Sequence, residues 1–270
     1  MNRITTLLIT VMMAAAAVAQ DYKTERDIAF TVKTDAYAKE RLKLDIYHPA
    51  DKRDCPVVVW FHGGGLEAGS KELPNELKGK GWVVVGVNYR LLPKVTVDKT
   101  LDDAAEAVAW VFKHIEAYGG DKHKIVVSGH SAGGYISMML CLDKRWMARY
   151  GEDADSVMLY VPFSGQAVTH YNVRKMQGLD PLEVTIDEYA PIRWVRNDCP
   201  PLVLICGDRE AELFGRYDEN QYLARMMKLK GHQQTYLYEL QGYGHGSMAH
   251  PAFHILETHL RRMLGEKAEP

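Results

Sequence analysis

Ser131 stands in a pattern that could make it a nucleophile. Gly129-His130-Ser131-Ala132-Gly133, here called the serine turn, directly follows the apolar run 124–128 and precedes a helical pattern. A serine between such glycines sits on a sharp strand-to-helix turn, with its hydroxyl held above the sheet. The helix that follows also directs free N–H groups and a partial positive charge at the site. Taken alone the pattern is weak, because it arises by chance in about one chain of this length in ten.

A second motif strengthens the interpretation of Ser131 as a nucleophile. His62-Gly63-Gly64-Gly65, here called the glycine loop, also follows an apolar run. Its chance occurrence is on the order of a few in a thousand chains. Three glycines after a buried strand leave backbone amides unobstructed, and acyl transfer needs such donors aimed at the oxyanion of a tetrahedral intermediate. We therefore expect the amides of Gly64, Gly65 and Ala132 to form an oxyanion hole.

A general base is expected near the end of the chain, because the usual order for such a site is serine, acid, histidine. Gly242-Tyr243-Gly244-His245-Gly246 follows the last strand pattern, in a loop that could carry an imidazole to the top of the sheet. We choose His245 over His250 and His254, which fall in or near the final helical pattern and suit surface positions.

Three carboxylates could orient this histidine. Asp208, Glu210 and Glu212 all follow the apolar run 202–205. Either an aspartate or a glutamate can serve as the acid. The residues alone do not choose among the three.

The elements that must position these groups alternate along the chain. Apolar runs of strand length lie at 56–61, 82–87, 124–128, 156–161 and 202–205. Such runs are typical of parallel strands covered on both faces. Segments 28–32 and 42–47 predict an antiparallel edge, 234–240 a last strand, and 97–115 and 253–264 amphipathic helices. The pattern predicts an α/β fold with an eight-stranded, mostly parallel, doubly wound sheet.

Composition limits the class of protein. The 270 residues are 47% hydrophobic and 25% charged, which suits one large domain with a full core. The net charge of −2 provides no positive field for nucleic acid or an anionic membrane. We expect a small-molecule or carbohydrate partner and no nucleic acid; the sequence does not indicate an oligomeric state.

The four cysteines do not form an obvious disulfide framework. If the run between Cys199 and Cys206 is extended, their Cα atoms lie about 23 Å apart, too far for a bond. Cys55 and Cys141 are better explained as small buried residues, and no ligand-spaced cluster indicates a metal.

Residues 1–19 read as a secretory signal. Asn2-Arg3 gives a basic start, 4–18 is largely apolar, and Ala17-Val18-Ala19 supplies a cleavage site. The apolar stretch falls short of the roughly 18 to 20 residues that a membrane span needs, so no anchor is expected. We expect a secreted or periplasmic protein whose residues 20–270 form one domain, with a cap-like insertion at about 166–198.

Further motifs complete a family resemblance. Together with the serine turn and the glycine loop, Asn88-Tyr89-Arg90-Leu91, Trp110 and Tyr118-Gly119-Gly120-Asp121 resemble the bacterial esterase and lipase branch of the α/β hydrolases. The resemblance covers most of the chain from about Leu42 and implies the α/β-hydrolase fold. That branch includes acetyl and feruloyl esterases that act on plant polysaccharides. It implies a serine carboxylesterase that works through an acyl-enzyme and requires no metal or organic cofactor.

The resemblance also bears on individual site residues. Its acid commonly occupies the fourth position of Gly-Asp-x-Asp, which here is Glu210, so Glu210 is preferred, then Asp208 and last Glu212. Family members often carry tryptophan after the glycine loop, where this chain has Leu66. We expect Leu66, His62 and His130 to contact the substrate.

The identity of the ester is less constrained. Predicted export and the resemblance favour a carbohydrate ester of the acetyl or feruloyl xylan type. Tyr171, Tyr189 and Trp194 of the cap could stack on a sugar or a phenolic acyl group, although we expect plain packing for most of them. The alternatives are a small-molecule carboxylesterase or amidase with the same triad, and least of all a non-catalytic, hydrolase-like binding module.

Overall fold

The computed structural model describes residues 21–266. The predicted signal sequence at 1–19 lies outside the described residues. Within 21–266, no helix is both long and apolar enough to cross a membrane.

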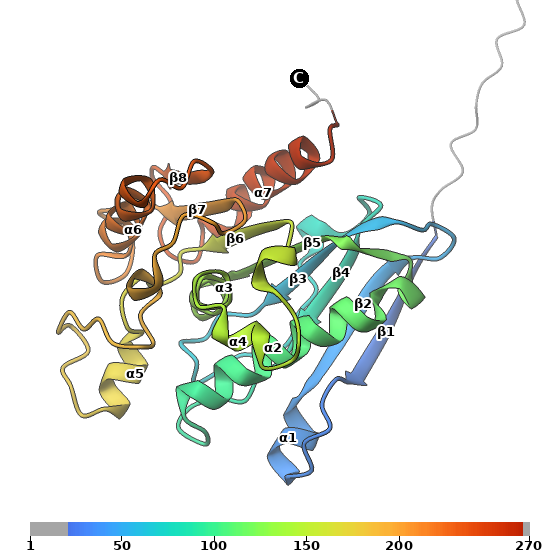
Figure 1. Cartoon of the computed structure of the whole chain (residues 1–270), viewed down its shortest axis with the longest axis horizontal. Coiled ribbons are helices and arrows are strands. Elements are labelled where there is room, and N and C mark those ends of the chain that lie inside the picture. Colours follow the sequence, from blue (N-terminus) through green and yellow to red (C-terminus); the bar gives the residue numbers. More distant parts are fainter. Residues whose placement is uncertain (1–20, 267–270) are drawn as a thin grey trace, which may run out of the picture.

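A single eight-stranded sheet organises the chain, in the order β1-β2-β4-β3-β5-β6-β7-β8 (Figure 1). The strands are β1 Tyr22–Ala29, β2 Lys43–Pro49, β3 Cys55–Phe61, β4 Val83–Val87, β5 Gly120–His130, β6 Leu159–Phe163, β7 Leu202–Gly207 and β8 Thr235–Leu240. β2 pairs antiparallel with both β1 and β4, and every other pairing is parallel. The predicted fold class is thereby confirmed. The carboxyl ends of β3, β5, β6 and β7 meet at one edge, where the chemistry-bearing loops begin.

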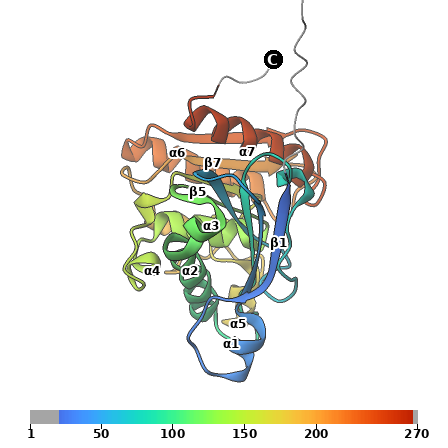
Figure 2. The same ribbon diagram turned by 90° about the vertical axis from the view of Figure 1, so that its right-hand side faces the viewer.

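Helices cover both faces of this sheet. They are α1 Ala36–Arg41, α2 Val97–His114, α3 Ala132–Leu142, α4 Arg145–Ala148, α5 Tyr171–Met176, α6 Arg216–Lys230 and α7 Ala249–Met263. Short 3-10 turns lie at Asn75–Leu77, Ile115–Tyr118, Ala154–Ser156 and Pro191–Trp194. The side view places α7 on one side of the sheet and α2, α3 and α4 on the other (Figure 2).

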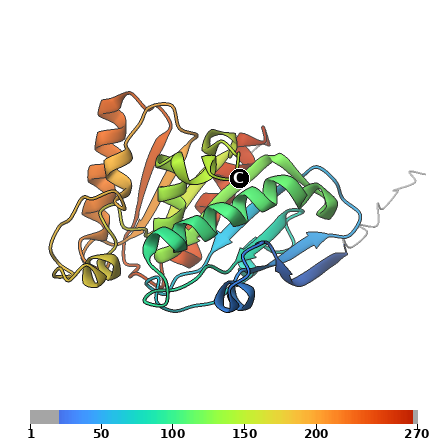
Figure 3. The same ribbon diagram turned by 60° about the horizontal axis from the view of Figure 1, so that its bottom comes forward.

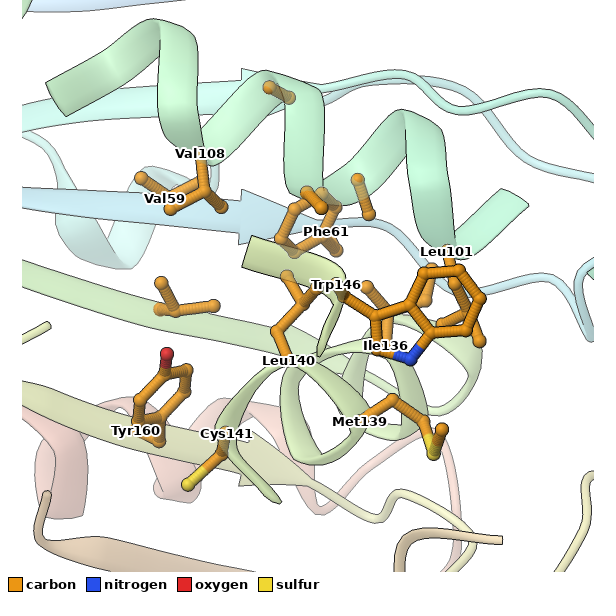
Figure 4. Close-up of a cluster of buried hydrophobic side chains, with 14 of the residues drawn as sticks. Val59, Phe61, Leu101, Val108, Ile136, Met139, Leu140, Cys141, Trp146 and Tyr160 are labelled. Atoms are coloured by element: carbon orange, nitrogen blue, oxygen red, sulfur yellow. The ribbon is translucent and has the colours of Figure 1, made fainter. Parts of the chain in front are cut away.

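Successive side chains of β3 point to opposite faces of the sheet, so this strand contributes to the buried clusters on both faces. Val59 and Phe61 point to the side of α2 and α3, where they belong to one buried cluster with Val108 and Leu140 (Figure 4). Trp60 points to the opposite side and packs on Phe253 of α7, with ring centroids 5.0 Å apart. Because successive strand residues face opposite sides, one apolar run serves both layers.

Some strands and helices differ from those predicted from the sequence. The segment predicted as a strand at 28–32 begins earlier, at Tyr22, and ends at Ala29; its register against β2 shifts between Glu25 and Ile28. The run at 156–161 starts its strand only at Leu159, since Asp153 caps a 3-10 turn before it. Helix α6 was not predicted, because it buries few apolar side chains. All four cysteines are buried free thiols, so Cys199 and Cys206 do not pair.

Residues 164–201 connect β6 to β7 outside the sheet and include α5, which projects at one end of the molecule (Figure 3). The predicted cap-like insertion at 166–198 falls within this connection. Tyr189 and Trp194 pack against the main core, which confirms plain packing for these two aromatics. The guanidinium of Arg145 also lies 4.0 Å from the centroid of the Trp194 ring. Tyr171 occupies a different environment.

Candidate active site

Ser131 lies on the tight turn between β5 and α3. Its backbone has φ 56° and ψ −113°, an unusual conformation for a residue with a side chain. The flanking glycines permit this turn: a Cβ on Gly129 would lie 2.5 Å from the carbonyl oxygen of Phe61, and one on Gly133 would overlap that oxygen. The serine turn therefore sits directly on the end of β3. Its amide donates to the carbonyl of Phe163 at 2.8 Å, which ties the turn to β6 as well.

A continuous hydrogen-bonded chain joins Ser131 to a histidine and a carboxylate. The Ser131 Oγ lies 2.9 Å from Nε2 of His245. The Nδ1 of His245 lies 2.8 Å from Oε2 of Glu212, whose side chain is only 1% exposed. His245 comes from the loop after β8, and Glu212 from the loop after β7. The expected pairing of Ser131 with His245 is present in the structure, and His250 and His254 lie exposed on α7.

Glu212 is the carboxylate that contacts His245, so the prediction of Glu210, with Asp208 as its alternative, is wrong. Glu210 is exposed, and within residues 21–266 the carboxylate bonded to His245 is that of Glu212. Asp208 accepts from the amides of Glu210 at 3.0 Å and Gly242 at 2.8 Å, so it ties together the two loops that carry the acid and the base. The physical reason is a turn: the amides of Ala211 and Glu212 donate to the Asp208 carbonyl at 2.9 and 2.8 Å. This turn folds the fourth residue after Asp208, not the second, back toward the sheet.

Ser164 is a site residue that the sequence reasoning missed. Its Oγ donates to Oε1 of Glu212 at 2.6 Å and lies 2.9 Å from Nδ1 of His245. The residue is fully buried and has φ 47°, so its backbone is strained. Its carbonyl accepts a hydrogen bond from the buried guanidinium of Arg216. No motif marks Ser164; the available signal is its place directly after β6, at the edge where the other site loops begin.

The environment of Glu212 keeps its carboxylate ionised. Burial by itself raises the pKa of this group, but hydrogen bonds from His245, Ser164 and the Gly207 amide outweigh it and lower the pKa to about 2. The amide contact to Oε1 is 2.8 Å. An ionised carboxylate at Nδ1 fixes the imidazole tautomer that leaves Nε2 free to accept a proton from Ser131.

His130 supports the base from the other side. Its Nε2 donates to the carbonyl of His245 at 2.8 Å, and the two rings lie 4.8 Å apart. Burial, assisted by the charge of His245, lowers the pKa of His130 to about 4, so it is neutral at pH 7. His130 also lines a cavity of about 320 Å³ with Trp60 and Phe253, on the α7 side. Its role as a substrate contact stays a prediction.

The glycine loop runs beside the nucleophile. A Cβ on Gly63 would lie 3.5 Å from the Cβ of Ser131. Gly64 and Gly65 have φ 109° and 62°, which favours glycine at both positions. Ala132 is the first residue of α3, so its N–H has no acceptor within the helix. These positions are compatible with the predicted oxyanion hole of Gly64, Gly65 and Ala132, which stays a prediction.

His62 and Leu66 lie beneath the glycine loop and not in an open substrate site. Leu66 is fully buried and His62 is 2% exposed, so their prediction as substrate contacts is wrong. The His62 ring stacks on Tyr89 with centroids 4.3 Å apart. Its Nδ1 donates to the Gly63 carbonyl at 2.6 Å while Nε2 accepts from Arg41 at 3.1 Å. Burial lowers the pKa of His62 to about 4. Both side chains therefore fix the shape of the loop from below.

Comparison with known proteins identifies relatives. The family model BD-FAE matches residues 44–159. Esterase LipC of Mycobacterium tuberculosis is 28% identical over 228 residues, which cover 75% of this chain and 56% of that protein. The chain thus spans about half the length of the curated relatives that it matches.

Solved structures share the fold over nearly the whole chain. Thermogutta terrifontis esterase 2, phosphonylated by sarin, has a TM-score of 0.74 at 22% identity and covers 91% of this chain and 97% of its own. A truncated carbohydrate esterase from gut microbiota has a TM-score of 0.73 at 16% identity, with 93% and 99% covered. At these identities the likeness establishes the fold.

Proposed function

The chain belongs to the esterase branch of the α/β-hydrolase superfamily, and on that premise we propose that it hydrolyses carboxylic esters with Ser131 as nucleophile. His245 serves as general base and Glu212 as the acid that orients it. One observation carries the proposal: the unbroken hydrogen-bonded chain from Ser131 Oγ through His245 to Glu212, with contacts of 2.9 and 2.8 Å. The order along the chain is serine, acid, histidine, as this fold requires.

The geometry supports a two-step acyl transfer. Ser131 Oγ attacks the ester carbonyl while its proton passes to Nε2 of His245, and the Glu212 carboxylate stabilises the imidazolium that forms. Amides of the glycine loop and of Ala132 receive the developing oxyanion. Nε2 then protonates the leaving alcohol, which departs and leaves an acyl-enzyme. Water, deprotonated by His245, attacks the acyl group, and the carboxylic acid leaves as Ser131 recovers its proton.

For the substrate we propose a carbohydrate ester carrying acetyl or feruloyl groups, of the xylan type. Support comes from the similar fold of a carbohydrate esterase from gut microbiota and from the secretory pattern at residues 1–19. A small-molecule ester is the second candidate, because Thermogutta terrifontis esterase 2, which shares the fold, has been solved with propionate and with butyrate bound.

Release of acetate and ferulate from acetylated and feruloylated xylan tests both candidates. The mature protein is compared with Ser131→Ala, whose fold is checked by circular dichroism. Release by the wild type that disappears in the variant is the expected result, and the product identifies the acyl group. Turnover of p-nitrophenyl acetate without release from either xylan would favour the small-molecule ester. Turnover retained in Ser131→Ala would refute the nucleophile.

We also propose that the protein is exported to the periplasm or beyond the cell. The basic start, the apolar stretch and the small residues at 17–19 support cleavage before Gln20. Amino-terminal sequencing of protein recovered from the periplasm and the medium tests this. A chain that begins at Gln20 is expected, and an uncleaved chain retained in the cytoplasm would contradict export.

A further inference from the structure

Tyr171 belongs to the cap-like insertion, and its ring lies next to the loop that carries Glu212. It is the first residue of α5, and its ring stacks on His170 with centroids 4.5 Å apart. On another side lies Phe214, with centroids 5.4 Å apart. Phe214 follows Glu212 by two residues and is 48% exposed. The Tyr171 ring is thus fixed by two neighbours next to the candidate site.

The hydroxyl of Tyr171 lies against the glycine loop. A Cβ on Gly65 would lie 2.6 Å from this oxygen, so only glycine leaves room for it. The next residue, Asn172, donates from Nδ2 to the Gly65 carbonyl at 2.7 Å and fixes the peptide that follows. Two adjacent residues of the cap therefore set the position of one glycine that we expect to supply an oxyanion donor.

The O–H group of Tyr171 is available to donate a hydrogen bond. Throughout residues 21–266, no side-chain or backbone group forms a hydrogen bond with the Tyr171 hydroxyl, although the Tyr171 amide bonds Gln166 Oε1 at 2.8 Å. A phenolic O–H can donate one hydrogen bond, and tyrosine usually finds a partner for it. The ring is already fixed, so directing the donor costs little reorganisation, which is the condition for electrostatic catalysis.

The nucleophile and this hydroxyl contact the same short loop. The position of a Cβ on Gly63 is 3.5 Å from the Ser131 Cβ, and that of a Cβ on Gly65 is 2.6 Å from the Tyr171 hydroxyl. The Cα atoms of Gly63 and Gly65 are at most about 7 Å apart. The nucleophile and the Tyr171 hydroxyl therefore lie along the same three-residue stretch of the glycine loop, whose amides we expect to face the carbonyl oxygen of an ester attacked by Ser131.

We propose that Tyr171 is a further catalytic residue, whose hydroxyl donates a hydrogen bond to the oxyanion of the tetrahedral intermediate alongside the backbone amides. This inference rests on the proposed function. The hydroxyl keeps its proton throughout: it accommodates charge that develops on the carbonyl oxygen as Ser131 attacks and is released when the carbonyl re-forms. The cap thereby contributes to chemistry as well as covering the sheet edge.

Tyr171→Phe tests the proposal, because it removes the hydroxyl and keeps the ring between His170 and Phe214. With p-nitrophenyl acetate we expect kcat to fall roughly tenfold or more and KM to stay within about twofold, since the donor acts mainly in the transition state. The affinity for a trifluoromethyl ketone, which forms a tetrahedral adduct on the serine, should fall by a similar factor. Tyr222→Phe is the matched control, because Tyr222 is 56% exposed on α6, and its kinetics should match the wild type.

Each result decides the matter. Tyr171→Phe with a wild-type kcat and unchanged ketone affinity would overturn the proposal, as would a change confined to KM. If the loss of the hydroxyl disturbed the fold, Phe214→Leu would replace it: it keeps the hydroxyl, frees one side of the ring, and should lower kcat without weakening folding. Esterase activity that depends on Ser131 but not on Tyr171 would leave the proposed function intact. A wild type with no esterase activity and no reaction with the ketone would refute both.

Discussion

Replacing Glu212 by glutamine is the most informative change to the site. The swap keeps the shape of the side chain, removes its charge, and offers Nδ1 of His245 an amide that can hold the wrong tautomer. Hydrogen bonds lower the pKa of Glu212 from 4.5 to about 2 despite burial, which corresponds to about 3 kcal/mol in favour of the carboxylate. Three of those bonds, from His245, Ser164 and the Gly207 amide, act on an acid side chain that is 1% exposed, so solvent screens them little.

We expect Glu212→Gln to lower kcat by about 10³ to 10⁴, the range in which loss of the charge combines with the wrong tautomer. The assay is steady-state hydrolysis of p-nitrophenyl acetate at pH 7 to 8, with the fold checked by thermal unfolding. Glu210→Gln is the matched control: the same chemical change two residues away, on an exposed side chain, should leave kcat within about twofold. The reverse pattern, with Glu210→Gln inactive and Glu212→Gln active, would refute the assignment of the acid.

Other parts of the structure give further predictions. Ser164→Ala removes a 2.6 Å bond to Glu212 and should lower kcat about tenfold while KM holds, and an unchanged kcat would show that this hydroxyl is dispensable. The pKa of His62 is about 4 when folded and 6.5 ordinarily, so the unfolded chain binds its proton first as the pH falls. Stability present above pH 6.5 should therefore decline toward pH 4 by about 3 kcal/mol, and urea unfolding of His62→Gln should show a smaller decline than the wild type. Gly133→Ala forces a Cβ onto a strand carbonyl and should destabilise the fold by about 3 kcal/mol or more, whereas Gly246→Ala, which meets open space, should melt close to the wild type.

The parts of the site that sequence predicted are those fixed by local backbone needs. Ser131 needs φ 56° on a turn that packs against β3, and only the surrounding glycines allow it, so the pattern and the geometry coincide. The loop before His245 begins with Gly242 at φ 80° and was found in the same way. The sheet was likewise predictable, because long apolar runs such as β3 have few alternatives to a strand buried on both faces.

The acid could not be chosen from the sequence, because its position depends on a turn that no sequence motif predicts. Asp208, Glu210 and Glu212 are spaced at every second residue, and all could serve chemically. The carbonyl of Asp208 closes a helical turn, which brings the fourth position onto the end of β7 and leaves the second in solvent. The family pattern pointed to Glu210, which precedes the carboxylate that contacts His245 by two residues.

The burial of the side chains next to the motifs could not be predicted from the sequence either. His62 and Leu66 adjoin the glycine loop in sequence, and this suggested contact with substrate. The stacking of Tyr89 on His62 and the left-handed backbone of Leu66, at φ 64°, turn both side chains inward. Ser164 was missed for the opposite reason, since its role arises from strand order, which sets β6 beside β5 and β7.

Covalent trapping of the nucleophile tests the central claim most directly. The protein is incubated with an alkyl fluorophosphonate, and the adduct is located by intact-mass measurement and peptide mapping. The account predicts one adduct per chain on Ser131, formed much more slowly in His245→Ala and in Glu212→Gln, and absent in Ser131→Ala. An adduct on Ser164 or another residue, or labelling of Ser131 at an unchanged rate in His245→Ala, would contradict it.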